Sequence, residues 1–307
     1  MSKVPIAVPP PIVFAEACDR GLVREENQDS VLRAAIPLGQ LLIVADGIGG
    51  YQGGAVASKM VIESFHSHLA ALPAEYPAGQ AIEEAAAHAN ASVIAAATAP
   101  GSLYQHMGST VVMALLQKDA AGPLAWIGHI GDSRAYQVSA GQLIRLTSDH
   151  SAVQALLDRN IITPEQALNH PDASVLTRSL GHLPEVKIDI ERVPLLPGDT
   201  LLLCSDGLWG YVPEQEIERV VTDAALPVAA AAKALLQLAL AAGGQDNIGI
   251  EMARLAGPVA VALAAVPLRR RGFMDFFAVF LLIFAALGAI VTYGVRHQWL
   301  HNLLHAR

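Results

Sequence analysis

Aspartates stand at the ends of apolar segments in this chain, and that arrangement restricts both its fold and its chemistry. In VADGIGGYQGG, residues 44–54, the apolar run Leu41–Ala45 ends at Asp46 and is followed by a series of glycines. Acidic side chains are almost never fully buried unless they are paired or bind a metal. On this stretch alone two interpretations stand: a strand-to-helix turn with Asp46 as the helix N-cap, or a site whose glycines leave room for a ligand.

The same construction recurs along the chain, which favours a site. An apolar segment precedes Asp-Gly in LLLCSDGLWG, and further aspartates lie near glycines in IGHIGDSRAY and GGQDNIGI. If sheet packing brings these ends together, two unit charges about 4 Å apart repel by about 4 kcal/mol at an effective dielectric of about 20. Such a cluster needs cations, and oxygen-only ligands favour Mg²⁺ or Mn²⁺ over zinc. The aspartates concerned are Asp29, Asp46, Asp132, Asp206 and Asp246.

Two hard cations suggest a reaction class. A pair of such ions about 4 Å apart can activate a water molecule and hold a phosphoryl group for in-line attack. A phosphoryl substrate also needs a fixed cation, and a guanidinium matches phosphate with two parallel hydrogen bonds. Arg24 is the candidate, with a surface arginine paired to Glu25 or Glu26 as the alternative interpretation. The residues alone leave that choice open.

Strands and helices are expected in a mixed order. Hairpin-like strands interrupted by pairs of helices indicate an α+β fold of packed layers rather than a regular βαβ alternation. The expected strands are Ile12–Cys18, Ser30–Ile36, Gln40–Ala45, Thr110–Gln117, Leu124–Ile130, Ala135–Val138, Val186–Val193, Thr200–Cys204 and Ile248–Arg254. The expected helices are Gly54–Leu69, Ala78–Ala97, Pro213–Thr222 and Pro227–Ala241.

Composition argues against several classes of protein. The chain of 307 residues is 53% hydrophobic and carries a formal net charge of −8. It has no basic stripe of the kind that nucleic-acid binding needs, so we expect no nucleic-acid partner. Cys18 and Cys204 lie far apart and outside any CxxC pair, which argues against a disulfide framework and against a cysteine zinc site.

An uncharged segment near the C-terminus predicts a single membrane span. Phe276–Val295 contains twenty residues without a charge, and a membrane-spanning helix needs about 20 apolar residues. A buried core helix is the alternative, but a core helix of that length usually shows a polar face. The proline-rich N-terminus does not predict a signal peptide, so we expect the N-terminal part to lie at the cytoplasmic face of the inner membrane. The expected organisation is a catalytic domain at 1–255, a linker with a basic cluster at 256–272, a transmembrane helix at 273–295 and a short tail at 296–307.

Eight motifs occur in the order and spacing of a known family. They are RGLVREENQD, VADGIGG, MGST, GDSRAY, LTSDHS, LTRSLG, LLLCSDGLWG and GGQDNI, spread between Asp19 and Arg254. Together they resemble the metal-dependent serine/threonine phosphatases of the protein phosphatase 2C type, in their bacterial form. The resemblance implies an αββα sandwich, in which two antiparallel sheets are flanked by helix pairs and the metals lie in a cleft at one end. It also implies two bound Mg²⁺ or Mn²⁺ ions, with a third ion in bacterial members.

The resemblance assigns roles to individual residues. Asp46 would bind both ions of the pair, and Arg24 would bind the substrate phosphate, so these two are the expected catalytic residues. The segment Ser148–His182 resembles the flap that covers the cleft and shapes access for protein substrates. The expected metal ligands are Asp29 (directly or through water), Asp46, Gly47 (through its carbonyl), Asp132 (for the third ion), Asp206 and Asp246.

Some positions depart from the family pattern or have a supporting role in it. Many eukaryotic members have a histidine where Ile48 stands, and it is thought to protonate the leaving group; here a metal-bound water or another group must supply that proton. Gln28 stands in place of a glutamate ligand, which implies weaker binding of the second metal. His129 is expected to be a hydrogen-bonded core histidine, and Asp149 with His150 to organise the flap. Thr110, Ser133, Asn247 and Trp209 are expected in structural or supporting positions.

These expectations combine into one leading hypothesis. It is a membrane-tethered enzyme that hydrolyses phosphoserine and phosphothreonine on proteins, in opposition to a serine/threonine kinase and its targets. A catalytically silent member that binds phosphoproteins as a membrane scaffold is the main alternative, although such proteins normally lose metal aspartates. A phosphatase for small molecules is a third possibility, against which the flap-like segment argues.

Overall fold

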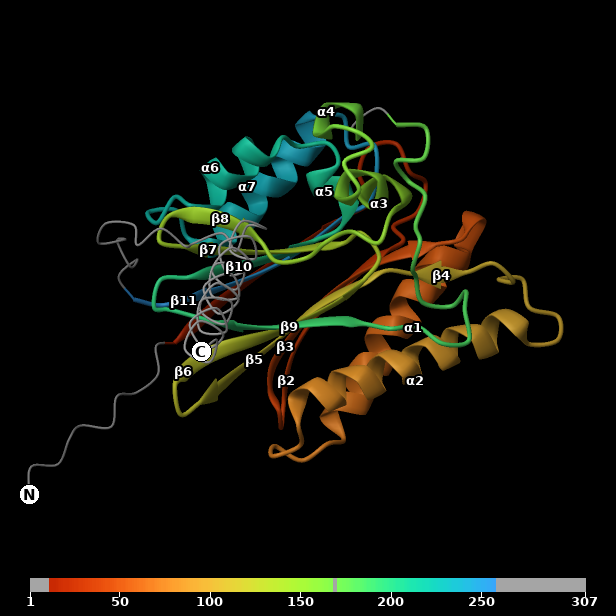
Figure 1. The fold of residues 1–307 in the computed structure, drawn as a ribbon, viewed down its shortest axis with the longest axis horizontal. Coiled ribbons are helices and arrows are strands. Elements are labelled where there is room, and N and C mark those ends of the chain that lie inside the picture. Colours follow the sequence, from red (N-terminus) through yellow and green to blue (C-terminus); the bar gives the residue numbers. More distant parts are fainter. Residues whose placement is uncertain (1–10, 168–169, 258–307) are drawn as a thin grey trace, which may run out of the picture. The chain divides into compact units, whose positions relative to one another are not determined.

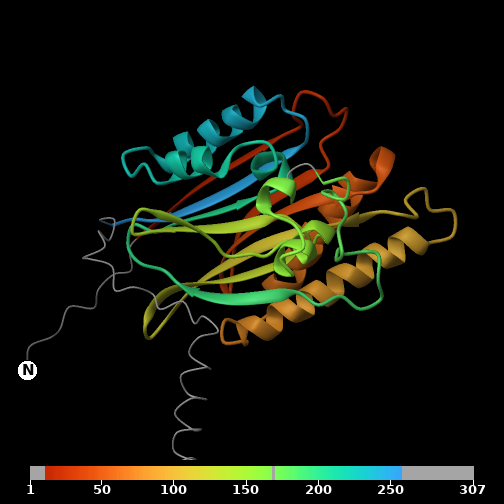
Figure 2. The same ribbon diagram turned by 45° about the horizontal axis from the view of Figure 1, so that its top comes forward.

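The described residues form a sandwich of two antiparallel sheets, each covered on its outer face by helices (Figure 1). The computed structural model describes residues 11–167 and 170–257. The expected α+β class and the αββα layer order are both confirmed. Figure 2 shows the helices on opposite sides of the two sheets.

The first sheet has the strand order β1-β11-β10-β7-β8. Its central strands β11 and β10 bring the C-terminal part of the chain beside β1, the first strand. All neighbouring strands in it run antiparallel. The bounds are β1 Ile12–Asp19, β7 Arg134–Ser139, β8 Gln142–Arg145, β10 Thr200–Cys204 and β11 Ile248–Leu255.

The second sheet has the strand order β2-β3-β5-β6-β9, and the short strand β4 pairs with the end of β3. Residues Leu41 and Ile43 of β3 face the helical layer, whereas Leu42 and Val44 face the other sheet. Both faces of β3 are therefore buried, which explains its continuous apolar sequence. The bounds are β2 Asp29–Ile36, β3 Gly39–Ile48, β4 Gly108–Ser109, β5 Val111–Asp119, β6 Gly122–Ile130 and β9 Asp189–Pro194.

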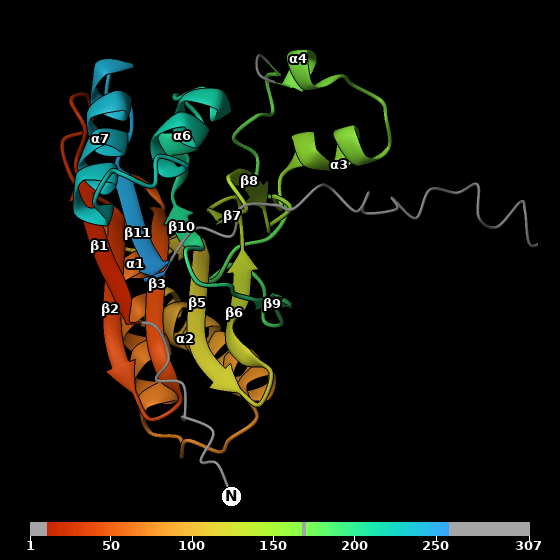
Figure 3. The ribbon, with the colours of Figure 1, turned by 90° about the vertical axis from the view of Figure 1, so that its left-hand side faces the viewer.

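The helices form two layers and one irregular segment. Helices α1 (Gly50–Ala70) and α2 (Ala78–Thr98) pack on the second sheet, and α6 (Glu214–Val221) and α7 (Val228–Ala241) pack on the first. A one-turn helix, α5 (Asp206–Trp209), follows β10 directly. Two further short helices, α3 (Ala152–Asp158) and α4 (Pro164–Ala167), belong to the segment between β8 and β9, and Figure 3 shows them apart from α6 and α7.

Most of the expected elements are confirmed, with differences at their ends. Helix α1 begins at Gly50, four residues before the expected Gly54, because Gly49 with φ +130° turns the chain directly out of β3. The strand expected at Val186–Val193 begins only at Asp189, where pairing with β6 starts. The sequence analysis did not predict β4, β8, α3, α4 or α5, all of which are seven residues or shorter.

The predicted membrane span cannot be compared with this structure. Within the ranges 11–167 and 170–257, no helix combines the length and the apolar character needed to cross a membrane. The uncharged segment Phe276–Val295, the basic cluster before it and the short tail after it lie outside the described residues. Tethering to a membrane therefore stays a prediction.

Candidate functional site

The second sheet places two of the predicted aspartates side by side. Strands β2 and β3 pair so that Asp29 lies opposite Asp46. The N–H of Asp46 donates to Thr110 Oγ1 at 3.0 Å, and the Ser109 hydroxyl donates to the Asp46 carbonyl at 2.9 Å. From the other sheet, the Ser205 hydroxyl donates to Asp29 Oδ2 at 2.6 Å. These bonds fix the backbone of Asp46 and the carboxyl group of Asp29 at the same end of the sandwich.

The first sheet and the crossover between the sheets supply the other acids. Asp206 opens α5 just after β10, and Asp246 lies just before β11, the neighbour of β10. Asp132 lies in the turn that leads from β6 of the second sheet to β7 of the first. Because these strand ends meet at one edge, five aspartates that are distant in sequence converge.

Asn247 ties the β1–β2 loop to this edge. Its Oδ1 accepts the N–H of Gln28 at 2.8 Å, and its Nδ2 donates to the carbonyls of Arg20 and Glu26 at 2.8 and 2.9 Å. The expected supporting role of Asn247 is confirmed, since one side chain holds three backbone groups of the loop that carries Arg24. Thr110 and Ser133 share a hydrogen bond of 2.7 Å behind Asp46 and have the same kind of role.

A cavity of about 1200 Å³ opens over these residues. Asp29 is buried beneath it next to Asp46 and does not line it. Arg24, Glu25 and Glu26 form part of one side, and residues 174–183 of the segment between β8 and β9 form another. The predicted site residues that line the cavity are Arg24, Asp46, Gly47, Asp132, Asp206 and Asp246, together with Gln28 and Ile48.

Four carboxyl groups of this cluster, those of Asp29, Asp46, Asp132 and Asp206, have raised pKa values. Burial, followed by the charge of Asp29, raises the pKa of Asp46 well above its ordinary value. Burial and then the charge of Asp132 do the same to the pKa of Asp206. Burial raises the pKa of Asp29 to about 7 although Ser205 donates to it, and burial with the nearby Asp149 raises the pKa of Asp132 to about 6.

This donor set fits divalent cations. Four aspartates and a glycine-rich stretch line one cavity, and a fifth aspartate lies below it. The repulsion between their carboxylates is relieved when hard cations bind. No histidine or cysteine belongs to the cluster of aspartates, so the chemistry of the donors favours Mg²⁺ or Mn²⁺ over softer metals.

Arg24 is held at the rim of the cavity by an acid of the cluster. Its Nη2 donates to Asp246 Oδ2 at 2.7 Å, and its side chain is 54% exposed. The ion pair of Arg24 with Glu25 or Glu26 that the sequence left open is not formed in the structure, where Arg24 pairs with Asp246. The guanidinium is exposed, lines the cavity and lies next to its acids, as a phosphate-binding residue requires.

Residues 148–182 lie between β8 and β9 and are here called the flap; part of the range 174–182 lines the cavity. Its start is bound to the β6–β7 turn, where the His150 N–H donates to the Gly131 carbonyl at 2.8 Å. Its end is bound to β4 by two backbone hydrogen bonds between Ser109 and Leu180, of 3.1 and 2.9 Å. Both ends of the flap are therefore attached next to the aspartate cluster.

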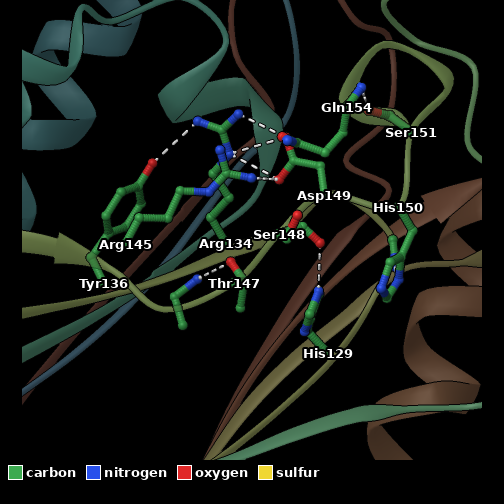
Figure 4. A network of polar contacts seen from close by, with 12 residues as sticks. His129, Arg134, Tyr136, Arg145, Thr147, Ser148, Asp149, His150, Ser151 and Gln154 are labelled. Carbon is green, nitrogen blue, oxygen red and sulfur yellow. Dashed lines mark hydrogen bonds and ion pairs between the residues drawn. The ribbon is translucent and has the colours of Figure 1, made fainter. Parts of the chain in front are cut away.

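A buried ionic network anchors the flap (Figure 4). Arg134 donates to Asp149 through Nε, to Oδ1 at 3.0 Å and to Oδ2 at 3.3 Å, and through Nη2 to Oδ2 at 2.7 Å. Asp149 also pairs with Arg145. The Arg134 guanidinium lies 3.4 Å from the centre of the Trp209 ring on α5. The network thus joins the flap to the strand after Asp132 and to the helix that Asp206 begins, which confirms the expected organising role of Asp149.

A second group of possible metal donors lies beneath the flap. One nitrogen each of His129 and His150 and a carboxylate oxygen of Asp189 lie within 4.8 Å of one another. Among the residues the structure describes, no other group of three or more histidine, cysteine or acidic side chains has its donor atoms this close together. The His150 Nδ1 accepts the Gly131 N–H at 3.1 Å, so its Nε2 carries the proton and donates to Asp189 at 3.2 Å. His129 Nε2 lies 2.9 Å from the Ser148 carbonyl, to which it donates.

These hydrogen bonds argue that the histidine pair is structural. The two rings stack with centroids 4.5 Å apart. Burial lowers the pKa of His129, and burial together with His129 lowers the pKa of His150 to about 4, so both rings are neutral near pH 7. The expectation that His129 is a hydrogen-bonded core histidine is confirmed.

Comparison with known proteins decides the family. The protein phosphatase 2C family model matches residues 23–241, most of the described chain. The chain belongs to the protein phosphatase 2C family. This match covers every residue that lines the cavity except Asp246 and Asn247, which lie just before β11.

Curated relatives and a solved structure of the family agree. The chain is 39% identical over 244 residues to the serine/threonine protein phosphatase PstP of Mycobacterium tuberculosis, and the match covers 78% of this chain but 44% of that protein. It is 35% identical over 237 residues to the serine/threonine phosphatase stp of Listeria welshimeri, covering 76% of this chain and 91% of that protein. The catalytic domain of PstP, solved in complex with two manganese ions, superposes with a TM-score of 0.68 at 33% identity, over 80% of this chain and 99% of that one.

Sequence reasoning missed the flap residues that face the site. Arg178, Ser179 and His182 line the same cavity as the aspartates, although the sequence marked them only as part of a flap-like segment. No spacing rule points to them, because their positions depend on the Ser109–Leu180 pairing rather than on a strand end. The MGST motif, whose Ser109 makes that pairing, was the available signal.

Proposed function

We propose that this member of the protein phosphatase 2C family hydrolyses phosphoserine and phosphothreonine esters on proteins. The observation that carries the proposal is the convergence of five aspartates, from both sheets and the turn between them, under one cavity with an exposed arginine at its rim. Acids gathered in this way suit cations, and the arginine suits a phosphate group. The cavity is open and wide enough for a side chain presented by another protein.

The proposed roles follow the positions of the residues. Asp46, Asp206 and Asp246 would hold two Mg²⁺ or Mn²⁺ ions with the carbonyl of Gly47, Asp29 would support them from below, and Asp132 would hold a third. When bound, such ions neutralise the phosphoryl oxygens and lower the pKa of a water molecule so that it can attack phosphorus.

The chain's own side chains position the reactants. Arg24 would turn from Asp246 to the phosphate oxygens, a small movement for a guanidinium that is half exposed. Thr110, Ser109 and Asn247 would keep the acids and the β1–β2 loop in place through the bonds described above. The flap would lie over the rest of the substrate and limit its access to water.

We also propose that the enzyme acts at a membrane, in opposition to a serine/threonine kinase. Support comes from the uncharged segment Phe276–Val295 and the arginines 269–271 before it. If the proposal holds, the full chain stays with the membrane fraction after alkaline carbonate extraction, and a chain ending at residue 257 is released. A full chain that carbonate extracts completely contradicts the tether while leaving the phosphatase activity unaffected.

The test of the activity uses the full chain stripped of metal with a chelator. Phosphate release from a phosphothreonine peptide is measured with and without Mn²⁺, beside Asp206→Asn and the control Asp223→Asn, an exposed acid between α6 and α7. We expect release only with metal, loss in Asp206→Asn and full activity in Asp223→Asn. A folded, metal-loaded protein that binds the peptide without turnover would favour the alternative, a silent phosphoprotein-binding scaffold.

A further inference from the structure

A histidine of the flap occupies the space next to Ile48. In β4, Gly108 pairs directly with Ile48 of β3. A Cβ on Gly108 would overlap Cε1 of the His182 ring, so the imidazole lies directly against the glycine backbone. His182 and Ile48 both line the cavity above the aspartates. The glycine therefore makes room for an imidazole that would otherwise be excluded from this part of the site.

The orientation of this ring is fixed by a neighbour on the flap. Ser179 Oγ lies 2.7 Å from His182 Nδ1. A hydroxyl can donate to a neutral imidazole or accept from a protonated one, so the contact survives a change of protonation. Nε2 has no hydrogen-bond partner among the described residues, and His182 is exposed. One ring nitrogen is thus held by the protein and the other remains available to a substrate.

The cavity offers few other proton donors. An arginine side chain cannot give up its proton in a protein, and the aspartates that line the cavity are the proposed ligands of cations. Glu25 and Glu26 line the side of the cavity that carries Arg24, whereas His182 lies on the side formed by the flap. Hydroxyl groups of serine and threonine are too weakly acidic to act near pH 7. A histidine ordinarily titrates near 6.5, which suits a group that must give and regain a proton in each cycle. His182 is the one histidine among the described residues that line this cavity.

We propose that His182 is a catalytic residue that protonates the leaving oxygen of the phosphorylated side chain. The proposal rests on the phosphatase function proposed above and names the source of the proton that Ile48 cannot supply. Ser179 is the positioning residue for the ring. Gly108 gives the ring its place, and the pairing of Ser109 with Leu180 holds the flap end that carries it.

The proposed step balances as follows. The oxygen of water forms a bond to phosphorus while the bond from phosphorus to the serine or threonine oxygen breaks. The electron pair of the broken bond stays on that oxygen, which takes the proton from Nε2 of the protonated His182. The attacking water brings two protons; one stays on the released hydrogen phosphate, and the other returns through solvent to His182, which is then ready for the next cycle.

Leaving-group chemistry gives a test that structural damage cannot imitate. An alkoxide needs a proton to leave, whereas p-nitrophenolate is a weak base and leaves without one. We would measure kcat of the metal-loaded full chain on a phosphothreonine peptide and on p-nitrophenyl phosphate. The variants are His182→Gln, Ser179→Ala and the control His106→Gln, which changes an exposed histidine outside the cavity lining.

For His182→Gln we expect kcat on the peptide to fall by about 100-fold, the low end of general acid catalysis, with p-nitrophenyl phosphate turnover nearly unchanged. Ser179→Ala should show a smaller loss of the same selective kind, and His106→Gln no loss. An equal loss on both substrates, or an unchanged kcat on the peptide, overturns the role of His182. A wild-type chain inactive on both substrates overturns the phosphatase function itself, so the two failures are distinguishable.

Discussion

The floor and the flap of the cavity are built in different ways. The floor consists of strand ends from both sheets, where register and backbone hydrogen bonds place each aspartate, as in the pairing of Asp29 with Asp46. The flap has little regular structure, with short helices α3 and α4, and it is fixed by contacts at its two ends. One region inherits its geometry from the fold, and the other from a few side-chain and backbone contacts.

The two regions also differ in charge and therefore in the chemistry they can supply. The floor is acidic and suits cations, whereas the flap lines the cavity with Arg178 and His182 and exposes apolar side chains such as Ile161 and Val175. We infer that the floor determines whether phosphoester hydrolysis occurs, and that the flap determines how fast a given substrate reacts. Substitutions in the two regions should therefore fail in different ways.

The largest effect is expected on the floor. Asp46→Asn removes the charge that lies opposite Asp29 and beside the other acids. We expect turnover to fall by about 1,000-fold, which corresponds to a loss of about 4 kcal/mol of transition-state stabilisation. Both the phosphothreonine peptide and p-nitrophenyl phosphate should be affected alike, because the floor acts on the phosphoryl group. A variant that retains one-tenth of the wild-type rate on either substrate would contradict this role of the floor.

The second-largest effect is expected for the ionic network that anchors the flap, and it should lower the free energy of unfolding. Asp149→Asn leaves Arg134 and Arg145 without their shared carboxylate, and breaking a buried ion pair on one side costs about 3 kcal/mol. Denaturant unfolding measures the change, with Asp119→Asn, which removes an exposed ion pair with Arg192, as the control that changes little. If Asp149→Asn were as stable as the control, the network would not be the anchor of the flap.

Removing the metal should reveal the repulsion of the floor as a dependence on pH. The pKa of Asp29 is raised to about 7 and that of Asp132 to about 6, so the folded chain binds more protons than the unfolded chain. Stability of the metal-free protein should therefore fall as pH rises from about 4 through 7, with Tm dropping by about 5 °C.

Mn²⁺ should remove most of that dependence, because cations stabilise the charged carboxylates. Glu251, buried between the sheets, provides a matched contrast: burial raises its pKa to about 8, and it lies away from the cavity lining. Because Glu251 lies away from the cavity, Mn²⁺ should not remove its contribution to the pH dependence of stability, whereas the Glu251→Gln substitution should. Thermal unfolding from pH 4 to 9 with chelator or with Mn²⁺ measures both, and a metal-free protein that grows more stable with pH would contradict the raised pKa values.

The smallest effect is expected at the rim. Arg24→Lys keeps the charge but loses the paired donors, so KM for both substrates should rise by about tenfold, the worth of one hydrogen bond to a charged group. The control is Arg192→Lys, at a half-exposed residue of β9 that pairs with Asp119 of β5. An unchanged KM would indicate that Arg24 only forms its ion pair with Asp246 and does not bind phosphate.

The contrast between the floor and the flap explains which features could be predicted from the sequence. Apolar strands that end in aspartate follow from local pattern, so the layers, most strands and all five acids of the floor were predictable. The partner of Arg24 was not, because Asp246 lies 222 residues away and is brought near by the pairing of β1 with β11. The place of His182 was not predictable either, since it depends on the missing side chain of Gly108 and on the bridge between Ser109 of β4 and Leu180 of the flap.

Direct measurement of metal binding tests the central claim, that the floor holds the cations. Calorimetric titration of the full, chelator-stripped chain with Mn²⁺ would be compared with Asp46→Asn and with Asp189→Asn, which breaks the histidine group beneath the flap. We predict at least two bound ions in the wild type and in Asp189→Asn, and loss of tight binding in Asp46→Asn. Binding that survives in Asp46→Asn but disappears in Asp189→Asn would contradict the account and place the metal beneath the flap.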